Sequence, residues 1–196
     1  MKKIFVYVCV LCVGYGSLMS CQPTNDQQKA EESEEMDLPA PTVVKTSLAA
    51  PDQFENVLTS YFMLKDSFVK SDTTEINQKA TDLIGATNKV DTTKLNTEVQ
   101  TKWKTSKAMI IRSVTTLQTE KGLEDKRAGF EDLSKIMYEV VNTYGATTTV
   151  YKQYCPMALN DKGAYWLSVN KEIKNPYFGD KMLECGEVQE VLTFEK

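Results

Sequence analysis

The stretch that decides the fold is residues 52–69, which read DQFENVLTSYFMLKDSFV. Apolar side chains recur there every three or four positions, so they line one face of an α-helix. That face consists of Phe54, Val57, Leu58, Tyr61, Phe62, Phe68 and Val69, together with the aliphatic stem of Lys65. The segment therefore predicts an amphipathic helix that packs this face against neighbouring helices.

Three segments downstream repeat the pattern. Residues 72–75 (DTTE) resemble a capping box at the start of a second helix, and Asp91 is the predicted cap of a third. Gly122 separates the third helix from a fourth, which ends at Tyr144 because Gly145 suits the left-handed position just past a helix. Their inward positions are Ile76, Ala80, Leu83, Ile84 and Thr87, then Leu95, Val99, Trp103, Ile110, Val114 and Leu117, then Leu123, Arg127, Phe130, Leu133, Met137, Val140, Val141 and Tyr144. Four such helices joined by short turns predict a mainly α, up-and-down four-helix bundle.

The C-terminal part of the chain has a different composition. Residues 147–154 (TTTVYKQY) and 187–194 (EVQEVLTF) are rich in β-branched and aromatic side chains, which favours strands. Proline and glycine punctuate the stretch between them, which predicts loops. If the two segments pair as a small β-hairpin, Cys155 and Cys185 come next to each other. We therefore expect one domain over residues 51–196, in which the bundle carries this hairpin and a loop-rich segment that contains Cys and Met.

The N-terminus has the pattern of an export signal. Two lysines precede an apolar run over residues 4–19, which is shorter than the ~20 residues of a spanning helix and typical of a signal peptide. The run closes on LMSC at residues 18–21, which resembles the lipobox in which a cysteine receives a diacylglycerol. We predict a signal peptide at 1–20, a lipidated Cys21 and a disordered acidic tether at 21–50. An uncleaved N-terminal anchor helix is the alternative.

Charge and composition exclude several classes of function. The chain has 196 residues, and without Lys2 and Lys3 it keeps 21 basic against 27 acidic residues, a net charge of −6. Nucleic-acid binding needs clustered positive charge, so we exclude it. Histidine is absent, which removes the usual general base for a serine or cysteine nucleophile. No glycine-rich phosphate loop is present either, and we predict that the protein is not an enzyme.

Four blocks of the C-terminal part occur in a recognisable order. They are residues 151–158 (YKQYCPMA), 162–168 (KGAYWLS), 173–179 (IKNPYFG) and 182–186 (MLECG). Together with residues 61–66 (YFMLKD) and 127–134 (RAGFEDLS), they resemble the DUF3347 family of exported Bacteroidetes proteins over residues 53–194. The same module is fused to periplasmic adaptor subunits of heavy-metal efflux pumps. The resemblance thus implies a cell-envelope protein, held on a membrane at its periplasmic or cell-surface side, with an efflux adaptor or another envelope protein as a partner.

The sulfur-bearing residues of these blocks suggest a metal. Cys155 and Met157 are two positions apart, Met182 and Cys185 three, and pairing of the strands would bring all four together. Soft thiolate and thioether ligands select Cu(I), whereas no carboxylates stand at a spacing that would complete a zinc site. Trp166 is a candidate for shielding the exposed edge of the metal. We therefore predict copper, as Cu(I), as the cofactor.

A disulfide is the competing interpretation. Two cysteines at adjacent strand ends in an oxidising compartment ordinarily pair, and a bond between Cys155 and Cys185 would contribute about 3–4 kcal/mol by constraining the unfolded chain. The protein would then be a non-catalytic interaction module of the cell envelope. Met157 and Met182 would fill gaps in the core. A hydrolase with an unrecognised site is a third alternative.

Overall fold

The computed structural model describes residues 40–46, 52–93 and 95–194, and all of them belong to one of two compact units, residues 39–196. The predicted signal peptide, Cys21 and the first part of the tether lie outside the described residues. Within the part of the chain that is described, no helix is both long and apolar enough to cross a membrane.

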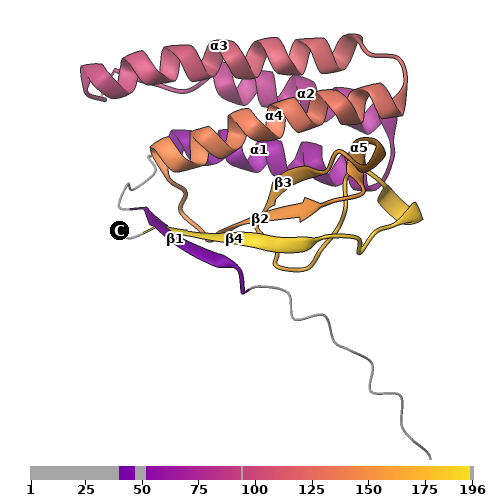
Figure 1. The fold of residues 1–196 in the computed structure, drawn as a ribbon. Coiled ribbons are helices and arrows are strands. Elements are labelled where there is room, and N and C mark those ends of the chain that lie inside the picture. The colour runs from indigo at the N-terminus through magenta and orange to yellow at the C-terminus, as the bar shows by residue number, and fades with distance from the viewer. Residues whose placement is uncertain (1–39, 47–51, 94, 195–196) are drawn as a thin grey trace, which may run out of the picture. The chain divides into compact units, whose positions relative to one another are not determined.

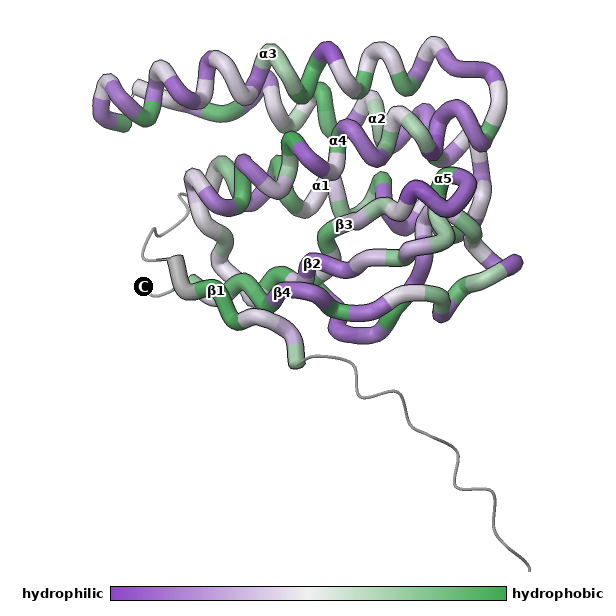
Figure 2. Tube along the Cα trace, in the orientation of Figure 1, coloured by the Kyte–Doolittle hydropathy of each residue, from purple (hydrophilic) through white to green (hydrophobic). Residues whose placement is uncertain are grey.

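Four long helices form the bundle that the sequence predicts. They are α1 (Asp52–Val69), α2 (Thr73–Asn88), α3 (Thr97–Thr119) and α4 (Leu123–Tyr144). Each packs on the next along the chain, α1 on α2, α2 on α3 and α3 on α4 (Figure 1). Hydrophobic and hydrophilic residues are interspersed along each helix, as expected of elements with one buried face (Figure 2).

The ends of the helices follow the predicted signals, with one exception. The Asp72 carboxylate caps α2 by accepting hydrogen bonds from the backbone N–H groups of Thr74 and Glu75. The predicted cap of α3 was wrong, because Asn96 and not Asp91 precedes the first turn and accepts from the Val99 amide. Asp91 instead accepts hydrogen bonds from the N–H and the hydroxyl of Thr93. Asp side chains favour this kind of local turn, and α3 begins only after it, at Thr97.

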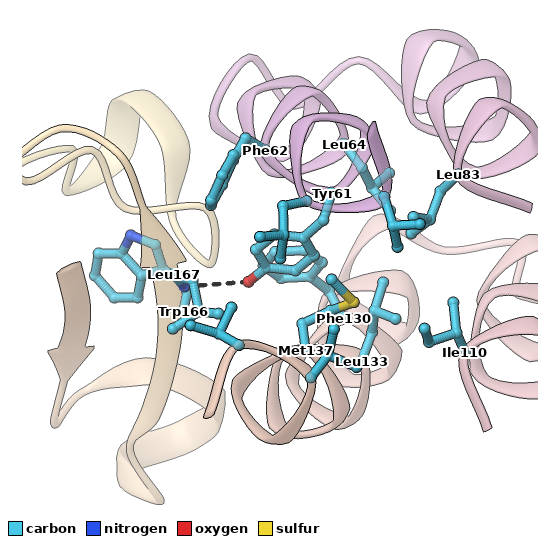
Figure 3. Close-up of a cluster of buried hydrophobic side chains, with 14 of the residues drawn as sticks. Tyr61, Phe62, Leu64, Leu83, Ile110, Phe130, Leu133, Met137, Trp166 and Leu167 are labelled. Carbon is cyan, nitrogen blue, oxygen red and sulfur yellow. Dashed lines mark hydrogen bonds between the residues drawn. The ribbon is translucent and has the colours of Figure 1, made fainter. Parts of the chain in front are cut away.

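The core of the bundle is aromatic where it meets the sheet. Tyr61 and Phe130 stack with ring centroids 5.5 Å apart, and Phe68 lies 4.7 Å from Phe130. The predicted inward positions of α1 are buried except Val69, and the buried Leu64 joins them. Figure 3 shows this cluster, in which the hydroxyl of Tyr61 accepts a hydrogen bond of 3.1 Å from the backbone N–H of Leu167. The bundle is thereby attached to the β part of the domain.

The β part is a four-stranded sheet of order β1-β4-β2-β3. Strands β2 (Val150–Cys155) and β4 (Glu187–Phe194) pair antiparallel, as predicted, although β2 begins three residues later than expected. Two strands were not predicted as such. Strand β3 (Ala164–Ser168) pairs with β2 and lies in the stretch read as loops, while β1 (Thr42–Thr46) pairs parallel with β4 and lies inside the stretch predicted as tether.

The helices cover one face of the sheet, and a loop covers the other. Helix α4 contacts β3, and Figure 3 shows Leu167 and Trp166 on opposite sides of that strand, as strand geometry requires. On the Trp166 side, the buried Gln153 amide donates hydrogen bonds to the carbonyls of residues 170, 171 and 172. Residues 170–172 of the loop that follows β3 are therefore fixed to the sheet face that faces away from the bundle.

Candidate functional site: a cysteine pair beside an acidic cleft

The two cysteines lie in contact. Cys155 is the last residue of β2, opposite Ala164 of β3, and Cys185 lies two residues before β4 begins. Their Sγ atoms are 2.8 Å apart, and both are free thiols in this structure. Cys155 is fully buried, whereas Cys185 is partly exposed. The proximity predicted from strand pairing is confirmed.

Asn175 holds the backbone that carries Cys185. Its side-chain amide donates to the carbonyl of Cys185 at 2.7 Å, and its own N–H donates to the carbonyl of Leu183 at 2.8 Å. Its side-chain oxygen accepts from the N–H of Tyr177, so this fully buried residue ties the start of the NPYFG turn to the cysteine segment. The sequence predicted only loops for the stretch that contains this turn, residues 175–179. The buried asparagine before proline is the signal that it missed.

Arg127 anchors the same turn to the helices. Its side chain is almost fully buried, and its Nε donates to the carbonyl of Pro176 at 3.1 Å. The other two guanidinium nitrogens reach Glu124 at 2.8 Å and the hydroxyl of Ser71 at 3.0 Å. The sequence placed Arg127 on the inward face of the fourth helix. At this point of the inward face the side chain makes polar contacts, and these attach the turn to α4.

Burial sets the protonation of the partly exposed thiol. Burial is the largest cause that raises the pKa of Cys185 to about 11, and the adjacent Cys155 thiol adds to the shift because it favours the neutral form. Cys185 is therefore a thiol and not a thiolate at neutral pH. A metal that binds there must displace the proton of the thiol. An alkylating reagent, which reacts with the thiolate form, modifies Cys185 slowly.

The two methionines meet in a cleft. Met157 follows β2 and is 46 % exposed, and Met182 precedes Cys185 in the turn after the short helix η1 (Gly179–Lys181). Both line a cleft of about 790 Å³ between α4 and the C-terminal loops. Neither cysteine lines this cleft. The structure thus brings the thiols together and the thioethers into one cleft, and the predicted set of four ligands stays a prediction.

Trp166 packs next to the cysteine segment. It is fully buried, and a Cβ on Gly186, the neighbour of Cys185, would lie 3.0 Å from its ring. Its ring meets that of Tyr177 edge to face, with centroids 6.0 Å apart. The contacts make Trp166 a packing residue of this corner of the sheet, and its predicted role in shielding a metal stays a prediction.

Carboxylates do not complete a metal site here. Among the described residues, no group of three or more Cys, Asp or Glu side chains is placed to hold a metal ion. Any soft metal at the cysteine pair would be held by the two sulfurs and by whatever thioether or backbone oxygen reaches it.

A protein-family model matches part of the chain. The model of the family described as "Protein of unknown function (DUF3347)" matches residues 57–149, which run from α1 to the segment before β2. No curated protein and no solved structure matches the chain. The cysteine pair and the cleft residues contributed by the loops lie beyond the matched segment, so the site is argued from its own geometry.

Proposed function

This chain belongs to the DUF3347 family through residues 57–149, and from the cysteine pair beyond that match we propose that it is an exported, lipid-anchored protein that binds Cu(I). The observation that carries the proposal is the contact between the Sγ atoms of Cys155 and Cys185 at 2.8 Å. Two thiolates on adjacent segments form a soft donor pair, and soft donors favour Cu(I) over the hard cations.

The surroundings of the pair suit metal handling. Cys185 is partly exposed, which favours approach of an ion from its side of the pair, while the buried Cys155 provides a fixed second ligand. Met157 and Met182 lie between the two cysteines in the chain and line the cleft, where a thioether could take part in delivery. The lipobox-like segment that ends at Cys21 supports attachment to a membrane of the cell envelope.

An anaerobic competition titration with Cu(I) tests the proposal. The reduced full chain, purified in a mild detergent, is compared with a Cys155→Ser/Cys185→Ser variant and with a Met157→Leu/Met182→Leu variant. We expect one tight equivalent of Cu(I) in the parent protein and its loss in the double serine variant. Thioether ligation predicts a weaker but still stoichiometric site in the double leucine variant.

The other three cysteines need a separate control, because Cys9, Cys12 and Cys21 supply further thiols if lipidation and cleavage are incomplete. A Cys9→Ser/Cys12→Ser/Cys21→Ser variant should keep the tight equivalent. Weak binding that is the same in the parent protein and in the Cys155→Ser/Cys185→Ser variant would contradict the copper proposal.

A second function is favoured by the same contact. A two-electron oxidant of the cell envelope, such as a thiol–disulfide exchange protein, could take up the two electrons as the thiols lose their protons and join in a disulfide. Thiols this close need only a small shift for that bond, which would close a loop between residues 155 and 185 and contribute about 3–4 kcal/mol. The protein would then be a non-catalytic interaction module of the cell envelope. Alkylation under denaturing conditions, followed by mass measurement of the protein isolated without reductant, distinguishes the two. An alkylated pair leaves the copper proposal standing, and a protected pair favours the disulfide.

A further inference from the structure

The copper proposal uses only the two thioethers of the cleft between α4 and the C-terminal loops. One wall is α4, and the opposite wall is the turn that contains the short helix α5 (Ala158–Asp161). Residues 159, 160 and 161 of that turn all have a left-handed backbone, with φ between 54° and 60°. Non-glycine residues rarely adopt this conformation, so the turn holds a fixed shape and is not an arbitrary loop.

Carboxylates dominate the rim of the cleft. Five line it, on α4 and on the α5 turn, against the single ammonium group of Lys162: Glu124, Asp125, Glu131, Asp132 and Asp161. Glu124 is paired with Arg127 and Glu131 with Lys135. Among the described residues, Asp125 on α4 and Asp161 on the opposite wall have no such ion pair. The α4 wall is therefore negative, and the opposite wall presents the Asp161 carboxylate beside the ammonium group of Lys162.

The rest of the lining is apolar, and part of it consists of flexible methionine side chains. Met157, Met182, Leu159 and Phe178 contribute to it, together with the edge of the buried Tyr177. Methionine side chains adapt to differently shaped apolar partners because they are unbranched and polarisable. An acidic rim around such a lining matches a ligand that is both cationic and apolar.

The charge pattern distinguishes the candidate occupants. A compact metal ion does not fit the rim, since the described carboxylates are not grouped to hold one. The chain's own residues 31–37 (EESEEMD) are acidic, and the whole chain has a net charge of −4, so neither that segment nor a second copy is complementary. A basic segment of a different protein is complementary, and helical segments with basic and apolar faces dock into grooves of this kind.

We propose that this cleft docks a basic amphipathic helix of a partner protein, with lysine or arginine side chains at Asp125 and Asp161 and apolar side chains on Met157 and Phe178. The proposal goes beyond copper binding and does not depend on it, because neither cysteine lines the cleft. Docking would place the partner beside the segment that carries Cys185.

A synthetic amphipathic helical peptide of lysine and leucine is the probe, and its binding to the full chain is measured by fluorescence anisotropy. The test variant is Asp125→Asn/Asp161→Asn, which removes one charge from each wall, and Asn tolerates the left-handed backbone at position 161. The matched control is Glu98→Gln/Glu139→Gln, which removes the same two charges from exposed positions outside the cleft. We expect the dissociation constant to rise about tenfold in the test variant and less than about twofold in the control.

Two further measurements make the outcome decisive. A second peptide, with serine in place of leucine, should bind at least about fivefold more weakly, since it loses the apolar contact. Peptide binding should be unchanged in the Cys155→Ser/Cys185→Ser variant, so a failure of copper binding leaves this result intact. Equal weakening in test and control variants, or equal binding of the two peptides, would show diffuse charge attraction and overturn the proposal. A concentration-dependent dimer with no peptide binding would overturn it in favour of a second copy.

Discussion

Replacement of Arg127 by methionine tests whether the helices hold the cysteine segment in place. Methionine keeps much of the side-chain length and removes the donor to the carbonyl of Pro176, which lies in a buried turn. A buried acceptor without a donor costs about 1–3 kcal/mol. The bond to Glu124, whose side chain is 74 % exposed, adds at most about 1 kcal/mol, and the removed desolvation of a buried charge offsets part of the total.

We therefore expect Arg127→Met to lower the free energy of unfolding by about 2–3 kcal/mol. In a domain of this size that corresponds to a midpoint of thermal unfolding lower by about 5–10 °C. The assay is denaturant and thermal unfolding of the full chain, with exposed Arg112→Met as a matched control that should change stability by less than about 0.5 kcal/mol. The thiol of Cys185 should also react faster with an alkylating reagent. A loss below about 0.5 kcal/mol with an unchanged alkylation rate would refute the role assigned to Arg127.

Three other outcomes follow from named contacts. The raised pKa of Cys185, about 11, keeps the thiol protonated at neutral pH. Cu(I) affinity should therefore rise at least about tenfold per pH unit between pH 7 and 9, as measured by competition titration. An affinity that does not change with pH would contradict proton displacement. Gly163→Ala should destabilise the protein by more than about 2 kcal/mol in denaturant unfolding, since φ is +75° and a Cβ would overlap the hydroxyl of Tyr154. Gly85→Ala in α2 meets no neighbouring atom and should stabilise the protein by about 0.5–1 kcal/mol. Tyr61→Phe removes the acceptor of the Leu167 N–H and should cost about 1–3 kcal/mol by the same assay, and no change would show that this contact does not attach the sheet to the bundle.

Local sequence predicted the bundle well because its signals are local. The 3–4 spacing in α1 and the glycine after α4 depend only on neighbouring residues. The spacing is found as expected, and Gly145 has the positive φ that favours glycine, 77°. The failure at Asp91 also has a local cause, since Asp91 binds Thr93 in a turn and Asn96 caps the helix instead. Propensity could not reveal β1, because five residues in an acidic, proline-containing stretch become a strand only when β4 provides the partner.

The sequence predicted one part of the candidate site, the cysteine pair, and not the other, the cleft. The strand pattern alone placed Cys155 and Cys185 together, since two antiparallel strands bring their adjoining ends to one edge. The cleft could not be predicted, because its walls come from α4 and from a left-handed turn whose positions depend on packing between distant segments.

The sequence by itself determined the four helices, the pairing of β2 with β4 and the family, because periodicity, turn chemistry and ordered motifs are properties of short stretches. The tertiary structure decided that the bundle covers only one face of the sheet, that Arg127 and Asn175 fix the NPYFG turn, and that Met157 and Met182 share an acidic cleft. These features depend on which buried polar groups find partners far away in the chain. Only the packed fold, in which every buried donor competes for an acceptor, selects those partners.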